Sequence, residues 1–447
     1  MKLAVVVQRY GADISGGAEL HARYIAERLA SHAEVRVFTT CAHDYVTWRN
    51  ALPAGRTEVN GVPVERFPVD RERDVADFGR RSVRVFDQTH SIEEELRWLA
   101  SEGPVSQRML DRLRTAAAGF DFVLAFSARY YHAYHAARIA PERTVLVPTA
   151  EREPSMGLRI FQPIFRGVRA IMYNSFEERA AITALSGNEH VPGVIVGVGS
   201  DVPAQVAPAR ARAQFGLRHP YIVYVGRIDS NKGCAELFDY FAQYLERSGR
   251  ELDLVLIGAP IMPVPEHPRI RHLGFVSDAD KFDVIAGARV LVMPSYYESL
   301  SMVALEAWAL GRPVLANAAC DVLVGQCVRS NAGLYYQDAR EFAATLDLML
   351  EDEALAATPG ANGRAFFTRH YAWPVIERKY LDMFERLRAS PPQHTMEPLP
   401  GWLARRSRTA PPSADLVKSL PSGPVLQRTP PAADGGRWHT FPQESRA

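Results

Sequence analysis

The segment that decides the fold reads Tyr221-Ile-Val-Tyr-Val-Gly-Arg-Ile-Asp-Ser-Asn-Lys-Gly233. It opens with five apolar residues, which have the length and composition of a strand buried on both faces of a parallel sheet. Gly226 and Arg227 follow this strand, and Lys232 stands at the start of the next helical stretch. A helix start offers backbone N–H groups and a favourable dipole to an anion, and both side chains add positive charge. The segment therefore predicts a strand, a loop that binds phosphate, and a helix.

A second segment reads Pro294-Ser-Tyr-Tyr-Glu-Ser-Leu-Ser-Met-Val-Ala-Leu-Glu-Ala-Trp-Ala-Leu-Gly-Arg-Pro313. It predicts a loop and then a helix, with Glu298 before the helix and Glu306 about two turns later, broadly on the same side. Carboxylates accept hydrogen bonds from hydroxyl groups, so the two segments together predict a pocket for a nucleotide-sugar. The plain structural alternative is a dipole-compensating role for Glu298 and a buried hydrogen bond for Glu306. We expect three unpaired N–H donors at the helix start, those of Ser299, Leu300 and Ser301.

Short apolar runs recur on both sides of the first segment, separated by helical stretches or glycine turns. This alternation is typical of doubly wound parallel sheets, whose ligands bind at the carboxyl ends of the strands. We therefore predict an α/β fold with two tandem Rossmann-like domains that face each other across a cleft. The runs are 3–7, 35–38, 121–125, 144–147, 170–173 and 194–196, with weaker strands around Val62 and Val85, and then 221–225, 252–257, 270–273, 290–293 and 314–316.

These motifs resemble the donor site of a known enzyme family. Gly226-Arg227 with Lys232-Gly233, the Glu298–Glu306 spacing and Ala309-Leu-Gly-Arg-Pro-Val314 are similar to those of retaining, GT-B fold glycosyltransferases of group 1 (GT4). The resemblance covers roughly residues 1–388 and is sharpest over 221–316. It implies that Arg227 and Lys232 stabilise a diphosphate, that Glu298 holds the donor sugar and that Glu306 holds the ribose.

The resemblance also implies a reaction. A sugar would pass from a UDP- or GDP-sugar, used as co-substrate without a further cofactor, to a hydroxyl of a glycan, a lipid-linked acceptor or a small molecule. The anomeric configuration would be retained, and the use would be polysaccharide or glycoconjugate biosynthesis. Two other functions remain open on the same fold: a noncatalytic nucleotide-sugar-binding protein, and an epimerase or sugar-phosphate synthase.

The predicted domains follow from the two series of strands. Residues 1–200 form an acceptor-binding domain and residues 201–365 a nucleotide-sugar-binding domain. Residues 366–390 form an amphipathic helix that, in the family, crosses back to the first domain. Residues 391–447 are rich in Pro, Ser and Arg, a composition that buries too little apolar surface to fold, so we expect a disordered tail.

Three groups in the first domain are further candidates. Gly16 and Gly17 follow the first strand, and a loop of small residues lets the backbone approach a phosphate or the acceptor closely. In relatives a histidine near the position of His132 and His135 contacts the donor sugar, and the sequence leaves open which of the two matches. Glu151 follows another strand, where relatives carry a polar group for the acceptor. Ser175 and Glu178 have the spacing of a helix capping box, which is a structural role.

Composition limits the partners and the compartment. The formal net charge of +1 gives no global field that would attract nucleic acid. Four Cys in 447 residues do not make a disulfide framework, which favours a reducing cytosol. No signal peptide or membrane-spanning stretch is evident, so we expect a cytoplasmic protein, with peripheral contact at the inner face of the membrane left open. No Asp-x-Asp pair directly follows a strand and no cluster has metal spacing, so we predict metal-independent chemistry.

Overall fold

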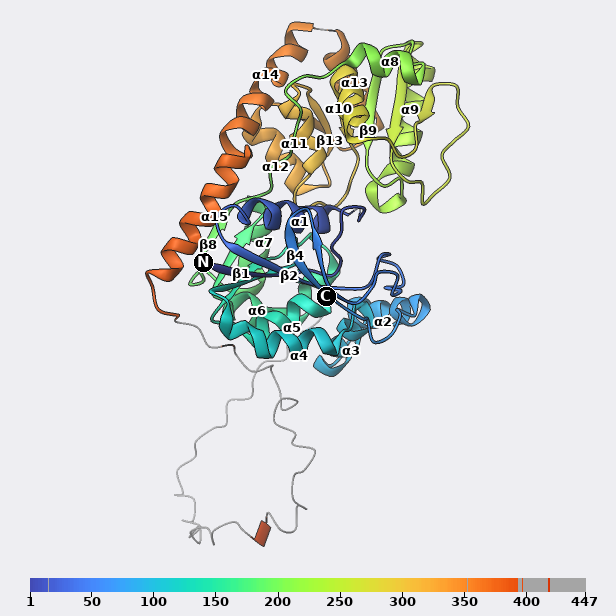
Figure 1. Cartoon of the computed structure of the whole chain (residues 1–447). Helices are drawn as coiled ribbons and strands as arrows, with labels where there is room; N and C mark the ends of the chain where they lie inside the picture. Colours follow the sequence, from blue (N-terminus) through green and yellow to red (C-terminus); the bar gives the residue numbers. More distant parts are fainter. Residues whose placement is uncertain (15, 352, 393–395, 397–416, 419–447) are drawn as a thin grey trace, which may run out of the picture. The chain divides into compact units, whose positions relative to one another are not determined.

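The structure is a computed structural model that describes residues 1–14, 16–351, 353–392, 396 and 417–418 (Figure 1). The chain divides into two units, Met1–Gly401 and Trp402–Ala447. Of the second unit only Val417 and Lys418 are described, so most of the predicted tail lies outside the described residues. None of the helices in the described ranges is long and apolar enough to cross a membrane.

The first unit contains two sheets, and the first sheet with its helices is called the first lobe. Its eight strands lie in the order β3-β4-β2-β1-β5-β6-β7-β8, all parallel except β3, which runs antiparallel to β4. Residues of β1 alternate between two apolar clusters, Leu3 and Val5 in one and Ala4 and Val6 in the other, because successive side chains point to opposite faces. The strands are β1 (Lys2–Val6), β2 (Glu34–Thr40), β3 (Gly55–Val59), β4 (Val62–Phe67), β5 (Phe122–Phe126), β6 (Thr144–Val147), β7 (Ala170–Tyr173) and β8 (Gly193–Ile195). The helices are α1 (Gly17–Leu29), α2 (Val75–Asp87), α3 (Ile92–Glu102), α4 (Gln107–Ala116), α5 (Tyr131–Ile139), α6 (Gln162–Gly167) and α7 (Phe176–Ser186).

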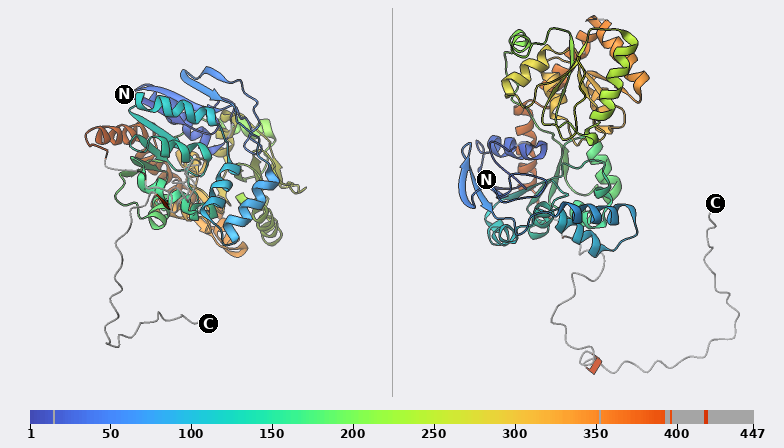
Figure 2. Two further views of the ribbon diagram at one scale, coloured as in Figure 1. Left: turned by 90° about the horizontal axis from the view of Figure 1, so that it is seen from below. Right: turned by 90° about the vertical axis from the view of Figure 1, so that its right-hand side faces the viewer.

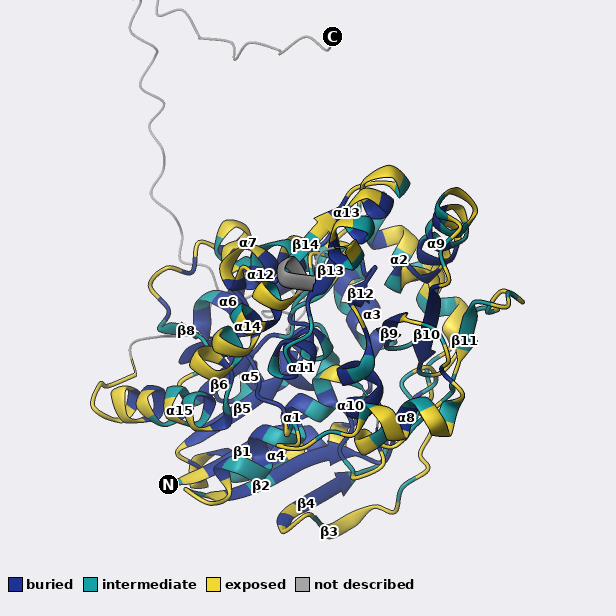
Figure 3. Ribbon diagram, turned by 90° about the horizontal axis from the view of Figure 1, so that it is seen from above, coloured by how far each residue is buried: buried dark blue, intermediate teal, exposed yellow. Residues whose placement is uncertain are grey.

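The second lobe is built on a six-stranded sheet in which all neighbours are parallel, in the order β11-β10-β9-β12-β13-β14. Figure 2 shows the helices on both faces of the sheets, and Figure 3 shows that most strands are buried, whereas the outward surfaces of the helices and the edge strand β3 are exposed. The strands are β9 (Tyr221–Val225), β10 (Asp253–Ile257), β11 (Ile270–His272), β12 (Leu291–Met293), β13 (Val314–Asn317) and β14 (Gly333–Tyr336). The helices are α8 (Pro208–Phe215), α9 (Cys234–Ser248), α10 (Asp278–Gly287), α11 (Met302–Ala309), α12 (Asp321–Ser330) and α13 (Ala339–Glu351).

Two further helices follow the second sheet, whereas the sequence predicts one helix over 366–390. Helix α14 (Glu353–His370) packs on the second lobe, where the rings of Phe366 and Trp308 meet edge to face at 5.7 Å. Helix α15 (Trp373–Arg388) packs on the first lobe, where Phe384 stacks on Phe122 at 5.1 Å. Pro374 lies in the first turn of α15, where its missing N–H is tolerated, whereas inside a continuous helix it would remove a hydrogen bond.

The start of the predicted tail contacts the first lobe. The Arg169 guanidinium donates to the carbonyl of Pro391 at 2.8 Å. Met396 packs so closely on Gly167 that a Cβ there would lie 2.9 Å from the Met396 sulfur. The compact core therefore extends a few residues beyond the predicted boundary at 390.

Candidate functional site

The two predicted donor-site segments meet at the point where the order of the second sheet reverses. β9 and β12 are neighbours, but the chain runs outward from β9 to β10 and β11 and, on the other side, from β12 to β13 and β14. Loops that leave such strands diverge and form a ligand crevice. Gly233 allows the two loops to approach, because its φ is 71° and a Cβ there would lie 2.0 Å from the Pro294 carbonyl oxygen.

Lys232 and Glu298 form an ion pair in this crevice. Lys232 Nζ lies 2.8 Å from Glu298 Oε1 and 3.3 Å from the carbonyl oxygen of Tyr297. Burial lowers the pKa of Lys232, but the carboxylates of Glu298 and Glu151 outweigh burial and raise the pKa overall. The predicted phosphate-binding cation and the predicted sugar-binding carboxylate thus neutralise each other, and the ammonium stays charged.

Arg227 is held by groups from both lobes. Its Nε pairs with the carboxylate of Asp229, and its Nη1 donates to the hydroxyl of Tyr45 at 2.9 Å. Tyr45 belongs to the loop after β2 in the first lobe, and its ring centre lies 5.3 Å from the Arg227 guanidinium carbon. Gly226 links Arg227 to the end of β9. Tyr45 could not be predicted from the sequence, since a lone tyrosine in a loop has no characteristic spacing.

Glu306 lies on α11 and is almost fully buried. Its Oε1 accepts from the Ser200 hydroxyl at 2.9 Å and from Lys281 Nζ at 3.1 Å. Its Oε2 is buried and has no hydrogen-bond partner within the described part of the chain. Buried polar atoms are nearly always paired, so this oxygen is fitted to accept from a ligand hydroxyl. Ser200 and Lys281 are contacts that the sequence analysis missed.

Helix α11 begins later than the sequence predicts. Ser301 is its N-cap, and the Ser301 hydroxyl accepts from the N–H of Ala304 at 3.2 Å. The prediction that Ser299, Leu300 and Ser301 supply the free N–H groups of the first turn is therefore wrong, because those residues precede the helix. Of the three serines around Glu298, Ser301 is the one whose hydroxyl reaches a first-turn N–H. Ser299 instead accepts from Asn174 Nδ2 of the first lobe, at 3.4 Å.

Gly16 and Gly17 stand at the N-terminus of α1, directly beyond β1. Gly16 has a φ of 153°, and a Cβ there would lie 2.3 Å from the carboxylate of Glu19. Glu19 pairs with Arg9 at 2.7 Å, and both side chains are buried. A Cβ on Gly17 would meet nothing within 4 Å, so this position borders open space. A ligand could therefore approach closely at Gly17, whereas Glu19 fills the space beside Gly16.

The two candidate histidines lie on α5, directly after β5, and both are neutral. Burial lowers the pKa of His132 to about 3 and that of His135 to about 4. His132 Nε2 lies 3.0 Å from the carbonyl oxygen of Phe126, while Nδ1 is buried without a partner among the described residues. His135 packs against the ring of Tyr131 at 4.2 Å. Between the two, the Nδ1 that has no partner among the described residues makes His132 the better candidate for a ligand contact.

Glu151 is the first-lobe candidate that the structure brings to the donor loops. Burial raises its pKa to about 7; Lys232 opposes this rise, and Glu298 and Glu153 add to it. Its carboxylate makes no hydrogen bond or ion pair within the described ranges, although it interacts electrostatically with Lys232 and Glu298 of the second lobe. Arg227, Lys232, Glu298 and Glu151 therefore gather in one place.

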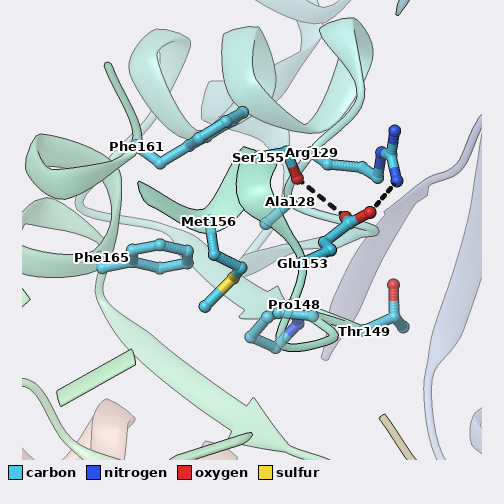
Figure 4. A pocket seen from close by; sticks show the side chains of 10 residues that line it. Ala128, Arg129, Pro148, Thr149, Glu153, Ser155, Met156, Phe161 and Phe165 are labelled. Carbon is cyan, nitrogen blue, oxygen red and sulfur yellow. Dashed lines mark hydrogen bonds and ion pairs between the residues drawn. The ribbon is translucent and has the colours of Figure 1, made fainter. Parts of the chain in front are cut away.

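A small pocket lies beside Glu151 at the carboxyl ends of β5 and β6. Arg129 bridges two carboxylates, that of Glu102 at 2.8 Å and that of Glu153 at 2.5 Å. Figure 4 shows Arg129 and Glu153 on one side of the pocket, with Met156 and Phe165 on the other. Nothing in the sequence indicates that Glu153 pairs with Arg129, because the two residues follow different strands.

Within the described residues, no group of three or more His, Cys, Asp or Glu side chains is arranged to hold a metal ion. Asp278 and Asp280 have Asp-x-Asp spacing but lie in the first turn of α10. Asp278 pairs with Lys281 at 3.2 Å and Asp280 with Arg210 at 3.0 Å. Both carboxylates are thus committed to structural ion pairs.

Comparison with known proteins agrees with this geometry. Residues 219–352 match the family model described as glycosyl transferases group 1. Over these residues the chain resembles the group 1 glycosyltransferases. A D-inositol 3-phosphate glycosyltransferase of Kribbella flavida is 33% identical over 188 residues, which are 37% of this chain and 44% of that protein. The enzyme of the same name from Kineococcus radiotolerans is 28% identical over 256 residues, 50% of this chain and 59% of that protein. This chain thus spans about half the length of these curated relatives.

Solved structures of the same architecture cover most of the chain. Anabaena HepE in complex with UDP and glucose matches with a TM-score of 0.65 and 17% identity, over 86% of this chain and 100% of that one. Sucrose-phosphate synthase from Thermosynechococcus elongatus matches with a TM-score of 0.61 and 19% identity, over 87% and 99%. At such low identity the likeness establishes the fold alone. The chain has the GT-B fold, as its sequence predicts.

Proposed function

We propose that this protein transfers a sugar from a nucleoside-diphosphate sugar to a hydroxyl group of an acceptor, with retention of anomeric configuration. The observation that carries the proposal is the Lys232–Glu298 ion pair, with Arg227 beside it, at the carboxyl ends of β9 and β12. A cation and a carboxylate at that edge match a diphosphate and a sugar respectively. UDP-glucose is the first donor to test, because HepE was solved in complex with it.

Each proposed role rests on a contact. The diphosphate would replace Asp229 as the partner of Arg227 and Glu298 as the partner of Lys232, since phosphate oxygens bind guanidinium and ammonium groups strongly. Glu298, released from Lys232, would accept hydroxyl protons of the donor sugar. The unpaired Oε2 of Glu306 would accept from the ribose. The Gly16–Gly17 loop would approach the phosphates from the first lobe.

The reaction needs stabilisation of the charge that develops on the leaving diphosphate. Arg227, Lys232 and nearby backbone N–H groups are fixed donors that would supply it, in the role that a metal ion has in other transferases. The departing phosphate oxygen would take the proton of the acceptor hydroxyl on the same face. We propose that the reaction is metal-independent and serves polysaccharide or glycoconjugate synthesis at or near the cytoplasmic face of the membrane.

One experiment separates this function from its rivals. The purified chain is incubated in EDTA with UDP- and GDP-sugars, alone and with acceptors that include inositol and D-inositol 3-phosphate, the compound in the names of two relatives. A transferase releases nucleoside diphosphate and forms a glycoside. An epimerase changes the sugar of the donor, and a noncatalytic binder changes neither. Loss of glycoside formation in EDTA, with recovery on adding Mg²⁺, would refute metal independence.

A further inference from the structure

Three carboxylates lie on the first-lobe wall of the site. Glu151, Glu153 and Glu102 share this wall with Arg129 and Arg73. Arg129 is bound by both Glu102 and Glu153. Arg73 lies 2.9 Å from the second oxygen of Glu102. Glu151 is thus the one of the three carboxylates for which the described residues provide no paired guanidinium.

The other cations beside this wall, two from the second lobe and one from the first, are also engaged. Lys232 pairs with Glu298, and Arg227 pairs with Asp229. Arg152, which flanks Glu151 in the sequence, lies 2.5 Å from Asp321 across the lobes. A bound diphosphate donor would also pair with Lys232 and Arg227. An anionic group on the acceptor would therefore meet no uncommitted positive charge among these side chains.

The unsatisfied groups next to Glu151 are mainly hydrogen-bond acceptors. Asn174 is 2% exposed, and its Oδ1 is buried without a partner in the described part of the chain. Its Nδ2 reaches Ser299 in the donor loop, so the unpaired oxygen lies where the lobes face each other. Arg129 keeps one N–H, on Nε, for which the described residues provide no partner, but two carboxylates neutralise its charge. A ligand that fits here brings hydroxyl donors rather than negative charge.

We propose that the acceptor unit that receives the sugar is an uncharged polyol or sugar without a phosphate group, and that its hydroxyls bind Glu151 and Asn174. This inference rests on the proposed function. A phosphate beside Glu151 and Glu153 would add like charge in a partly buried site, whereas a hydroxyl would satisfy oxygens that are otherwise unpaired.

The test compares matched acceptors that differ only by a phosphate: glucose with glucose 6-phosphate, and inositol with D-inositol 3-phosphate. Glycoside formation is measured with the donor that the protein binds. We expect the unphosphorylated member to have at least about a tenfold higher kcat/KM, the ratio that 1.4 kcal/mol of repulsion produces. Equal or better use of the phosphorylated member overturns the proposal. Failure of all four compounds overturns it too, because free polyols would then not be acceptors.

A charge-neutral variant tests whether Glu151 is responsible. Glu151→Gln keeps a hydrogen-bonding oxygen and removes the charge, and the fold is expected to persist because this carboxylate makes no structural bond. We expect the ratio between paired acceptors to fall at least about threefold. Glu142→Gln is the matched control, and this variant should leave the ratio unchanged. Glu142 precedes β6, at the opposite end of the strand from Glu151, and is 44% exposed. An unchanged ratio in Glu151→Gln would contradict the assignment.

Donor binding separates this inference from the proposed function. Calorimetry with UDP- and GDP-sugars in the absence of acceptor tests the donor site alone. If no donor binds, the proposed function fails. If a donor binds and reacts but phosphorylated acceptors are preferred, only the inference about the acceptor fails.

Discussion

At the scale of single residues, the site consists of charged side chains that hold one another in place. Lys232 pairs with Glu298, and Arg227 pairs with Asp229 and donates a hydrogen bond to the Tyr45 hydroxyl. Such contacts hold each side chain in a defined orientation, so less side-chain ordering is left for the moment of binding. Asp229 also fixes the loop, since it accepts from the Lys232 backbone N–H at 2.9 Å.

Tyr45 provides a test of this orientation. We expect Tyr45→Phe to weaken binding of a nucleoside diphosphate roughly fivefold, because it removes one hydrogen bond to Arg227, worth about 1 kcal/mol. Calorimetry with UDP and GDP measures the effect. Tyr131→Phe, which alters a ring packed on His135, serves as the control and should bind normally. Unchanged affinity in Tyr45→Phe would mean that the hydroxyl does not position Arg227.

Glu151 predicts a dependence on pH. Burial raises its pKa to about 7 from an ordinary value of 4.5, so it becomes a full carboxylate only above neutrality. We expect the KM for acceptor to fall as pH rises through about 7, and Glu151→Gln to flatten this dependence. The free energy of unfolding changes with pH in the opposite direction, because the Glu151 carboxyl keeps its proton to higher pH in the native state than in the unfolded state. Its contribution to the unfolding free energy is thus full at low pH and is lost between about pH 4.5 and 7. A KM that does not change with pH in the wild type would contradict the role of Glu151.

At the scale of elements, the α7 start joins two neighbouring strands. Ser175 caps the helix by accepting from the Glu178 N–H at 3.1 Å, as the sequence predicts. The Glu178 carboxylate does not complete a capping box: it accepts from the N–H of Asn174 at 2.5 Å and from that of Ala150 at 2.6 Å. Glu178 therefore ties the end of β6, next to Glu151, to the end of β7.

Removal of this tie should be costly. Glu178→Ala leaves two backbone N–H groups without their partner, so we expect the free energy of unfolding to fall by about 2–4 kcal/mol. Ser175→Ala, which removes only the cap, should cost about 1 kcal/mol. Urea denaturation of both variants and of the double variant measures the costs. If Glu178→Ala cost no more than Ser175→Ala, the bridge between the strands would carry no stability.

Local patterns revealed most strands but not their limits. The run 221–225 is β9, because five consecutive apolar residues fit only a strand buried on both faces. Val85 was taken for a weak strand and lies in α2, where an Asp74 cap and tertiary packing outweigh β-branched propensity. The strands β3 and β14 were not predicted: all but the last residue of β3 are exposed, and β14 is short and only partly buried. Edge strands of this kind lack the apolar signal on which the prediction rests.

At the scale of the whole molecule, the sequence indicates two Rossmann-like lobes but not the contacts between them. Lys232 and Glu298 belong to two motifs that each follow a predicted strand, so their common site was predictable. The contact of Arg227 with Tyr45 and the electrostatic coupling of Glu151 to Lys232 join residues of different lobes. Such contacts depend on how the lobes are oriented, which local periodicity does not encode. The pairing of Glu177 with Arg329 at 2.6 Å, between α7 and α12, is another example.

The end of the compact unit can be tested by truncation. A chain that ends at residue 401 should melt within about 1 °C of the full chain, because the Pro-rich residues beyond it offer little apolar surface to bury. A chain that ends at residue 390 should melt a few degrees lower, since it loses the Pro391–Arg169 bond and the packing of Met396 on Gly167. Thermal unfolding decides between them. Equal melting of the two truncated chains would show that Met396 contributes nothing.

The most direct test of the donor site is calorimetric titration of the wild type, Lys232→Ala and Glu298→Ala with a bare nucleoside diphosphate and with the corresponding donor sugar. Lys232→Ala should weaken both ligands by about 2–4 kcal/mol, because it removes a charge-assisted contact to phosphate. Glu298→Ala should spare the bare nucleotide and weaken only the sugar donor. Equal nucleotide affinity in wild type and Lys232→Ala, or a large loss of nucleotide affinity in Glu298→Ala, would contradict the assignment of these two residues.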